Sequence, residues 1–118
     1  MEVDVLIAGG GPGGLAAAEA IAARGWTAMV LEQDPEIGSP CRTSGGTFVA
    51  DMKEFDIPAR LYHTVSHCRF LSPNNSASFS YTDEPIVCVL DVRGTFQFLA
   101  ERAAAAGRSE ERRVGKEC

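Results

Sequence analysis

The chain of 118 residues is long enough for one small domain, and its composition, 45% hydrophobic and 23% charged, is that of a globular protein. A formal net charge of −5 argues against a nucleic-acid-binding function, which depends on a basic surface. The four cysteines form no CxxC pair, so we expect free thiols in a reducing, cytoplasmic environment rather than a disulfide framework.

The N-terminal segment combines two apolar runs with a glycine-rich turn. Residues 3–8 form a short apolar run, typical of a buried parallel strand, and the Ala-rich stretch 15–24 favours a helix that Gly25 ends. A second apolar run covers 27–31. Asp4 and Glu19 interrupt the apolar residues, which argues against a signal peptide or a membrane span. The order of apolar run, Ala-rich stretch and second apolar run predicts a strand–helix–strand unit.

Three glycines between the first strand and the helix, Gly9, Gly11 and Gly14, fit the pattern G-x-G-x-x-G. We expect Gly9 to make the tight turn, Gly11 to let a pyrophosphate approach the backbone, and Gly14 to let helix and strand pack closely. The helix N-terminus around Pro12 and Gly13 would then face the pyrophosphate with its free N–H groups.

Glu32 ends the second apolar run at about the spacing, roughly 20 residues after the glycines, expected of a ribose-binding carboxylate. We expect Glu32, with Gln33 beside it, to contact the cofactor ribose. A carboxylate there would repel a 2′-phosphate, which disfavours NADP at this site. The alternative is a glycine-rich turn without a ligand. It does not explain why the strand, the glycines, the helix and the acid occur together in the order of a dinucleotide-binding unit.

Residues 33–50 are predicted to form a loop, because two prolines and three glycines oppose a long helix or a central strand. The loop follows the ribose acid and is expected to run past the cofactor. Gly45 and Gly46 would permit close approach to a flat ring system. Arg42 could pair with a phosphate or a substrate anion, or it could be an exposed surface residue.

These motifs resemble those of a known family. The run Gly9–Gly14 with Leu31 and Glu32 resembles the FAD-binding start of glutathione-reductase-type flavoproteins. The loop is similar to the Gly-x-Pro-x-Arg-Cys-x-Gly-Gly segment of the geranylgeranyl reductase family, with Thr43 in place of the cysteine. The matching positions are Gly38, Pro40, Arg42, Gly45 and Gly46.

The middle of the chain is predicted to hold a short helix over 51–62, with Asp51 as N-cap and with Pro58 either limiting its length or starting a second turn. Two strands are expected over 64–71 and 76–81, joined by a turn at residues 73–75 into an antiparallel hairpin. His63, His67 and Cys68 have no second ligand pair nearby, so ordinary polar strand residues are the preferred interpretation and no metal site is predicted.

A last strand over 86–92 and a helix over 97–106, with Leu99, Ala103 and Ala106 facing the sheet, complete the regular structure. The segment from Arg93 to Phe96 is similar to the Asp-Arg-x-x-Phe-Asp helix start of the same family, with Val92 and Gln97 replacing the two acids. The resemblance implies that Arg93 approaches the flavin cofactor. The alternative is an Arg at a helix end in solvent.

Residues 108–118 are charged and nearly free of apolar side chains, where a further strand is expected. The peptide resembles the translation of a sequencing-library adapter, so we expect an unstructured, non-native tail; a natural charged tail is the alternative. Residues 1–107 would then be the N-terminal part of an FAD-binding domain.

The predicted fold is α/β: a Rossmann-like FAD-binding βαβ start with a parallel sheet and an inserted antiparallel hairpin, incomplete as a sheet. The resemblance implies an FAD-dependent oxidoreductase that reduces prenyl-type alkenes, with NAD(P)H as a candidate electron donor and a prenyl lipid, met at a membrane surface, as a candidate substrate. An FAD-dependent monooxygenase or halogenase, an NAD-binding domain, and a non-catalytic nucleotide-binding module remain alternatives. The oligomeric state and the catalytic residues are not predicted.

Overall fold

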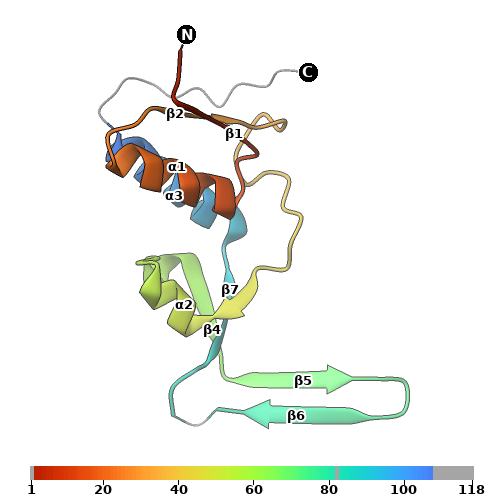
Figure 1. Ribbon diagram of the computed structural model, residues 1–118. Coiled ribbons are helices and arrows are strands. Elements are labelled where there is room, and N and C mark those ends of the chain that lie inside the picture. The colour runs from red at the N-terminus through yellow and green to blue at the C-terminus, as the bar shows by residue number, and fades with distance from the viewer. Residues whose placement is uncertain (1, 82, 108–118) are drawn as a thin grey trace. The chain divides into compact units, whose positions relative to one another are not determined.

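The structure is a computed structural model that describes residues 2–81 and 83–107 (Figure 1). The tail predicted over 108–118 lies outside these residues. The chain divides into two compact units: Thr43–Asp91 forms one, and the segments on either side of it, up to Arg42 and from Val92, form the other. Each unit is described by itself.

The first unit is a strand–helix–strand arrangement with one further helix. Strand β1 (Val5–Ala8) leads into helix α1 (Pro12–Ala23), and β2 (Ala28–Leu31) pairs with β1 in parallel, from Val5 opposite Ala28 to Ala8 opposite Leu31. Gly25 follows the helix and donates its N–H to the carbonyl of Ala22 at 3.0 Å. The parallel βαβ start predicted from the sequence is confirmed.

Helix α3 (Val92–Ala106) packs beside α1, and both helices run in the same direction (Figure 1). Their contact is built from small side chains, which let the helices and β2 approach closely. Arg102 donates to the Glu19 carboxylate at 3.0 Å and ties α3 to α1. Leu99 and Ala103 are buried as predicted, whereas Ala106 is only half-buried. The cluster comprises Ala18, Ala28 and Ala103, with Ile7, Ile21 and Val30 packed against it.

The Thr95 side chain of α3 offers a test of this packing. Thr95 is only 3% exposed, and its hydroxyl has no hydrogen-bond partner among the described residues. A buried hydroxyl without a partner costs about 1–3 kcal/mol. We therefore expect Thr95→Val to raise the free energy of unfolding by about 1 kcal/mol, measured by urea denaturation. Thr95→Ser, which keeps the hydroxyl and loses the methyl group, should lower it. A less stable valine variant would show that the hydroxyl is satisfied.

The second unit contains a three-stranded antiparallel sheet and a separate hairpin. Strand β7 (Val87–Leu90) lies between β3 (Gly46–Phe48) and β4 (Tyr62–Val65), while β5 (His67–Leu71) pairs with β6 (Ser76–Ser80). Helix α2 (Val49–Glu54) and the short 3-10 helix η1 (Ala59–Leu61) connect β3 to β4. The core of this unit includes the buried side chains of Cys88, Val49, Met52, Ile57 and Leu61.

Two predictions for this region are wrong in their boundaries. The loop predicted to reach residue 50 ends at Gly45, because β3 pairs with β7, a strand about forty residues later in the chain. Helix α2 begins at Val49 with Phe48 as its N-cap, so Asp51 lies in the first turn instead of capping it. Of the two roles predicted for Pro58, the start of a second turn is confirmed, because Pro58 is the N-cap of η1.

Two further boundaries differ from the prediction. The strand predicted over 64–71 is two strands in different sheets, separated by Ser66, whose carbonyl accepts the N–H of Tyr81 at 2.9 Å. Helix α3 starts at Val92 rather than at Gln97, because burial of Val92 and Thr95 against the unit outweighs their low helix propensity. The hairpin predicted over 64–81 is confirmed in its second half, between β5 and β6.

Within residues 2–81 and 83–107, no helix has the length and apolar content needed to cross a membrane.

Candidate nucleotide-binding site

The glycine-rich turn leads directly from β1 into α1. Gly9 has a φ of +100°, a conformation that side chains disfavour, and donates its N–H to the carbonyl of Leu31 at 2.7 Å. A Cβ on Gly14 would collide with the carbonyl oxygen of Gly9 and lie 3.2 Å from the Ile7 side chain. The turn and the close helix–strand packing predicted for Gly9 and Gly14 are therefore confirmed.

The N-terminus of α1 is open where a pyrophosphate is expected. A Cβ on Gly11 or Gly13 would meet no described atom within 4 Å. Gly11 is the N-cap and Pro12 begins the helix, and no side chain of the described residues caps it. The first-turn N–H groups of a helix lack intrahelical partners and attract anions. The arrangement fits a dinucleotide pyrophosphate, and its binding by these residues stays a prediction.

Glu32 holds the glycine-rich turn through its carboxylate. One oxygen accepts the N–H of Gly10 at 2.7 Å and the other accepts the N–H of Asp34 at 3.0 Å. The N–H groups of Asp34 and then Gly10 stabilise the charged form, so the pKa of Glu32 lies below its ordinary value. Each carboxylate oxygen has a second acceptor site, so Glu32 can still receive a ribose hydroxyl.

Sequence reasoning missed the role of Gly10. This glycine is buried, and a Cβ there would lie 3.0 Å from the Glu32 carboxylate and 3.3 Å from Ile37. Its position is an unspecified one in G-x-G-x-x-G, so the motif gives no reason to select it. The run of three consecutive glycines was the available signal.

Arg42 is paired within its own loop. Its guanidinium contacts both carboxylate oxygens of Asp34, at 2.5 and 3.2 Å, and its side chain is 60% exposed. The pKa of Arg42 is raised by Asp34 first and also by the charge of Glu32. The guanidinium is thus linked to the predicted ribose-binding acid through Asp34, which pairs with Arg42 and donates its N–H to Glu32. Gln33, which follows Glu32, is exposed.

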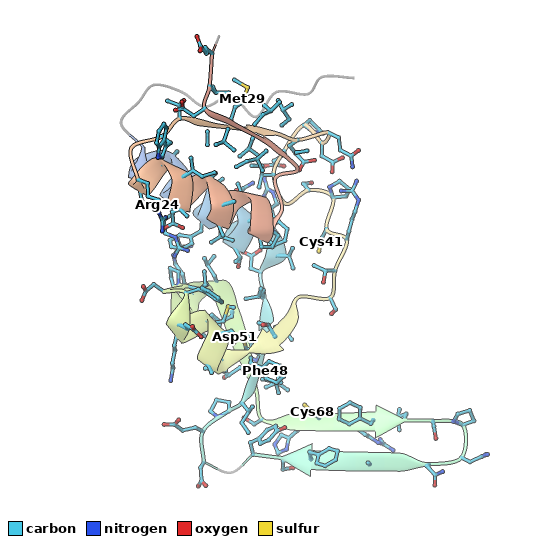
Figure 2. The ribbon with its side chains drawn as sticks, in the orientation of Figure 1. Arg24, Met29, Cys41, Phe48, Asp51 and Cys68 are labelled. Atoms are coloured by element: carbon cyan, nitrogen blue, oxygen red, sulfur yellow. The ribbon has the colours of Figure 1, made fainter. Side chains whose placement is uncertain are left out.

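The loop after β2 also packs on the first turn of α3, and Figure 2 shows its later part, around Cys41, as an extended segment. Glu36 pairs with Arg93 and accepts a hydrogen bond from Gln97 at 2.9 Å. The hydrogen bond from Arg93 is the main reason that the pKa of Glu36 lies below its ordinary value. The structure thus brings Arg93 to the loop that begins at Glu32.

Gly45 and Gly46 belong to the second unit. The carbonyl of Gly45 accepts the N–H of Leu90 at 2.9 Å, and Gly46 begins β3 opposite Val89. Gly46 is thus a sheet residue of that unit, Gly45 directly precedes the strand, and Phe48 ends it (Figure 2). Their predicted contact with a flat ring stays a prediction.

The described parts of the chain hold no group of three His, Cys, Asp or Glu residues that suits a metal ion. His63 lies on β4 and His67 on β5, strands of different sheets. Nδ1 of His67 hydrogen-bonds the Ser80 hydroxyl across the hairpin at 2.9 Å.

A parallel strand–turn–helix–strand unit with an open helix N-terminus and a carboxylate after the second strand defines a Rossmann-type nucleotide-binding protein. Residues 7–72 match the family described as NAD(P)-binding Rossmann-like domain, and the chain belongs to that family. The predicted fold class is confirmed.

Comparison with individual proteins shows which members of this broad class the chain is similar to. The chain is 32% identical over 111 residues to a digeranylgeranylglycerophospholipid reductase of Methanocella arvoryzae, covering 90% of this chain and 28% of that protein. It is 46% identical over 57 residues to the same-named protein of Methanospirillum hungatei, covering 48% of this chain and 14% of that protein. A geranylgeranyl bacteriochlorophyll reductase-like structure from Thermoplasma acidophilum matches with a TM-score of 0.77 and 33% identity, covering 89% of this chain and 28% of that one. The predicted resemblance to geranylgeranyl reductases is confirmed, and the chain spans under a third of these relatives.

Proposed function

We propose that the chain is the N-terminal, FAD-binding part of an oxidoreductase that reduces the double bonds of prenyl chains. The observation that carries the proposal is similarity along 90% of the chain to a reductase of geranylgeranyl lipids. The open N-terminus of α1 and the carboxylate of Glu32 supply the chemistry that a dinucleotide needs.

The segment after β2 supports FAD over NAD. In a plain NAD-binding domain a helix and another parallel strand usually follow. Here β2 leads into an irregular loop and then antiparallel strands. When bound, a flavin carries the hydride chemistry itself, so this part of the protein contributes binding and electrostatics. A prenyl-lipid substrate would be met at a membrane surface, and NAD(P)H is the proposed electron donor.

The cofactor part of the proposal is tested by binding. We expect the purified chain to bind FAD and quench its fluorescence, with NAD⁺ and NADP⁺ in large excess failing to displace it. The carboxylate of Glu32 repels a 2′-phosphate, so NADP⁺ should be the weakest competitor. Displacement of FAD by equimolar NAD⁺ would contradict the proposal and favour an NAD-binding domain.

The proposal that the whole protein is a reductase is tested by sequencing its gene. Independent sequencing of the source DNA past codon 107 should show the reading frame continuing into further strands of a substrate-binding region. Reduction of a geranylgeranyl lipid by that longer product would then separate a reductase from a monooxygenase or halogenase. A stop codon directly after residue 118 would contradict the reductase proposal and leave a small nucleotide-binding protein.

A further inference from the structure

We infer that Glu36, Arg93 and Gln97 form a clamp that fixes the loop between β2 and the second unit onto α3, and that Glu36 is a positioning residue for the predicted cofactor site, acting through this loop. The consequence for FAD rests on the proposed function. The clamp itself does not, because it joins side chains of the first unit only.

The hydrogen bonds of the clamp converge on one atom. Oε1 of Glu36 is the acceptor for both Arg93 and the amide of Gln97. Arg93 and Gln97 lie four positions apart on α3 and therefore share one face of the helix. A single carboxylate oxygen of the loop is thus held by two donors from successive turns.

The backbone near Glu36 also packs closely against α3, at Gly38. Gly38 has a φ of +79°, and a Cβ there would lie 2.9 Å from Cα and 3.1 Å from the carbonyl oxygen of Arg93. Ile37, between them, is 8% exposed. This close approach explains why glycine occupies position 38, which the sequence comparison identified only as a family match.

The clamp anchors the middle of a loop whose other anchors belong to the predicted site. At its start, Glu32 holds Gly10 and the N–H of Asp34; at its end, Arg42 pairs with Asp34. An irregular segment that is not held loses its preorganisation and must be ordered when a ligand binds. Fixing Glu36 on α3 therefore keeps the carboxylate of Glu32 and the guanidinium of Arg42 in place.

Both charged side chains are partly exposed, 58% for Arg93 and 43% for Glu36, so one ion pair alone would contribute little. We expect Glu36→Gln and Arg93→Gln each to raise the rate of trypsin cleavage after Arg42 in the FAD-free chain by about threefold to fivefold. The double variant should be no faster than either single one, because both remove the same interaction. Gly38→Ala should act more strongly, by about tenfold or more.

The matched control is Arg102→Gln, which removes another arginine–carboxylate pair from the same helix without touching the loop. It should leave cleavage after Arg42 unchanged. The reversed pair, Glu36→Lys with Arg93→Glu, should restore protection, which a general loss of stability would not allow. Cleavage after Arg42 that is unchanged in Glu36→Gln and Arg93→Gln would overturn the clamp.

FAD binding then tests the positioning role of Glu36. We expect Glu36→Gln to weaken FAD binding, because the loop that carries Glu32 and Arg42 is no longer fixed on α3. Unchanged or tighter FAD binding in Glu36→Gln, together with faster cleavage after Arg42, would show that the clamp does not position the cofactor site. If the wild-type chain binds no FAD but the cleavage pattern holds, the proposed function fails and the clamp stands.

Discussion

Gly14→Ala is expected to lower the free energy of unfolding by about 3 kcal/mol and to abolish binding of the dinucleotide. The added methyl group would overlap the carbonyl oxygen of Gly9 and press on Ile7. Neither neighbour can yield easily, because Gly9 is fixed by its hydrogen bond to Leu31 and Ile7 lies inside β1. Urea denaturation followed by circular dichroism would measure the first effect, and flavin fluorescence the second.

Gly13→Ala is the matched control for this substitution. It adds the same methyl group one residue earlier in α1, where no described atom lies within 4 Å. Alanine has the higher helix propensity, so this variant should be as stable as the wild type or up to about 1 kcal/mol more stable. Equal behaviour of the two variants would show that helix and strand do not touch at Gly14 as the structure places them.

The structure of the first 32 residues, which include both glycines, could be predicted from the sequence. In the first 32 residues every signal is local: an apolar run, a glycine turn, a helix-forming segment and a terminal acid. The strand, helix and turn there were predictable within two or three residues. The carboxylate of Glu32 was identified as a site residue for the same reason.

The remaining boundaries depend on partners far away in the chain. Residues 46–48 become a strand only by pairing with β7, and Ser66 separates two strands because they join different sheets. Neither effect can be seen in the local pattern, since strand formation depends on cross-strand packing more than on intrinsic preference. Within the site, Gly10 and the contact of Glu36 with α3 were missed because each joins residues distant in sequence.

Glu32→Gln is expected to weaken FAD binding about tenfold and to lower the free energy of unfolding by about 1–2 kcal/mol. Glutamine keeps one acceptor oxygen but points an amide group at the N–H of either Gly10 or Asp34, so one of the two hydrogen bonds is lost. Glu54→Gln makes the same change at an exposed position at the end of α2 and should alter neither quantity. Unchanged FAD affinity in Glu32→Gln would remove this carboxylate from the site.

The difference in stability between the wild type and Glu32→Gln is also expected to depend on pH. The pKa of Glu32 is lowered in the folded chain from its ordinary value of about 4.5, so its stabilising contribution is present above that pH and is lost as the pH falls through the folded-state pKa. Asp4 and Glu36, whose pKa values are also lowered, titrate equally in both proteins and cancel in the difference. The stability advantage of the wild type over Glu32→Gln should therefore be constant above about pH 5 and shrink below it. An advantage that grows on acidification would mean that the N–H groups of Gly10 and Asp34 do not hold the charged form.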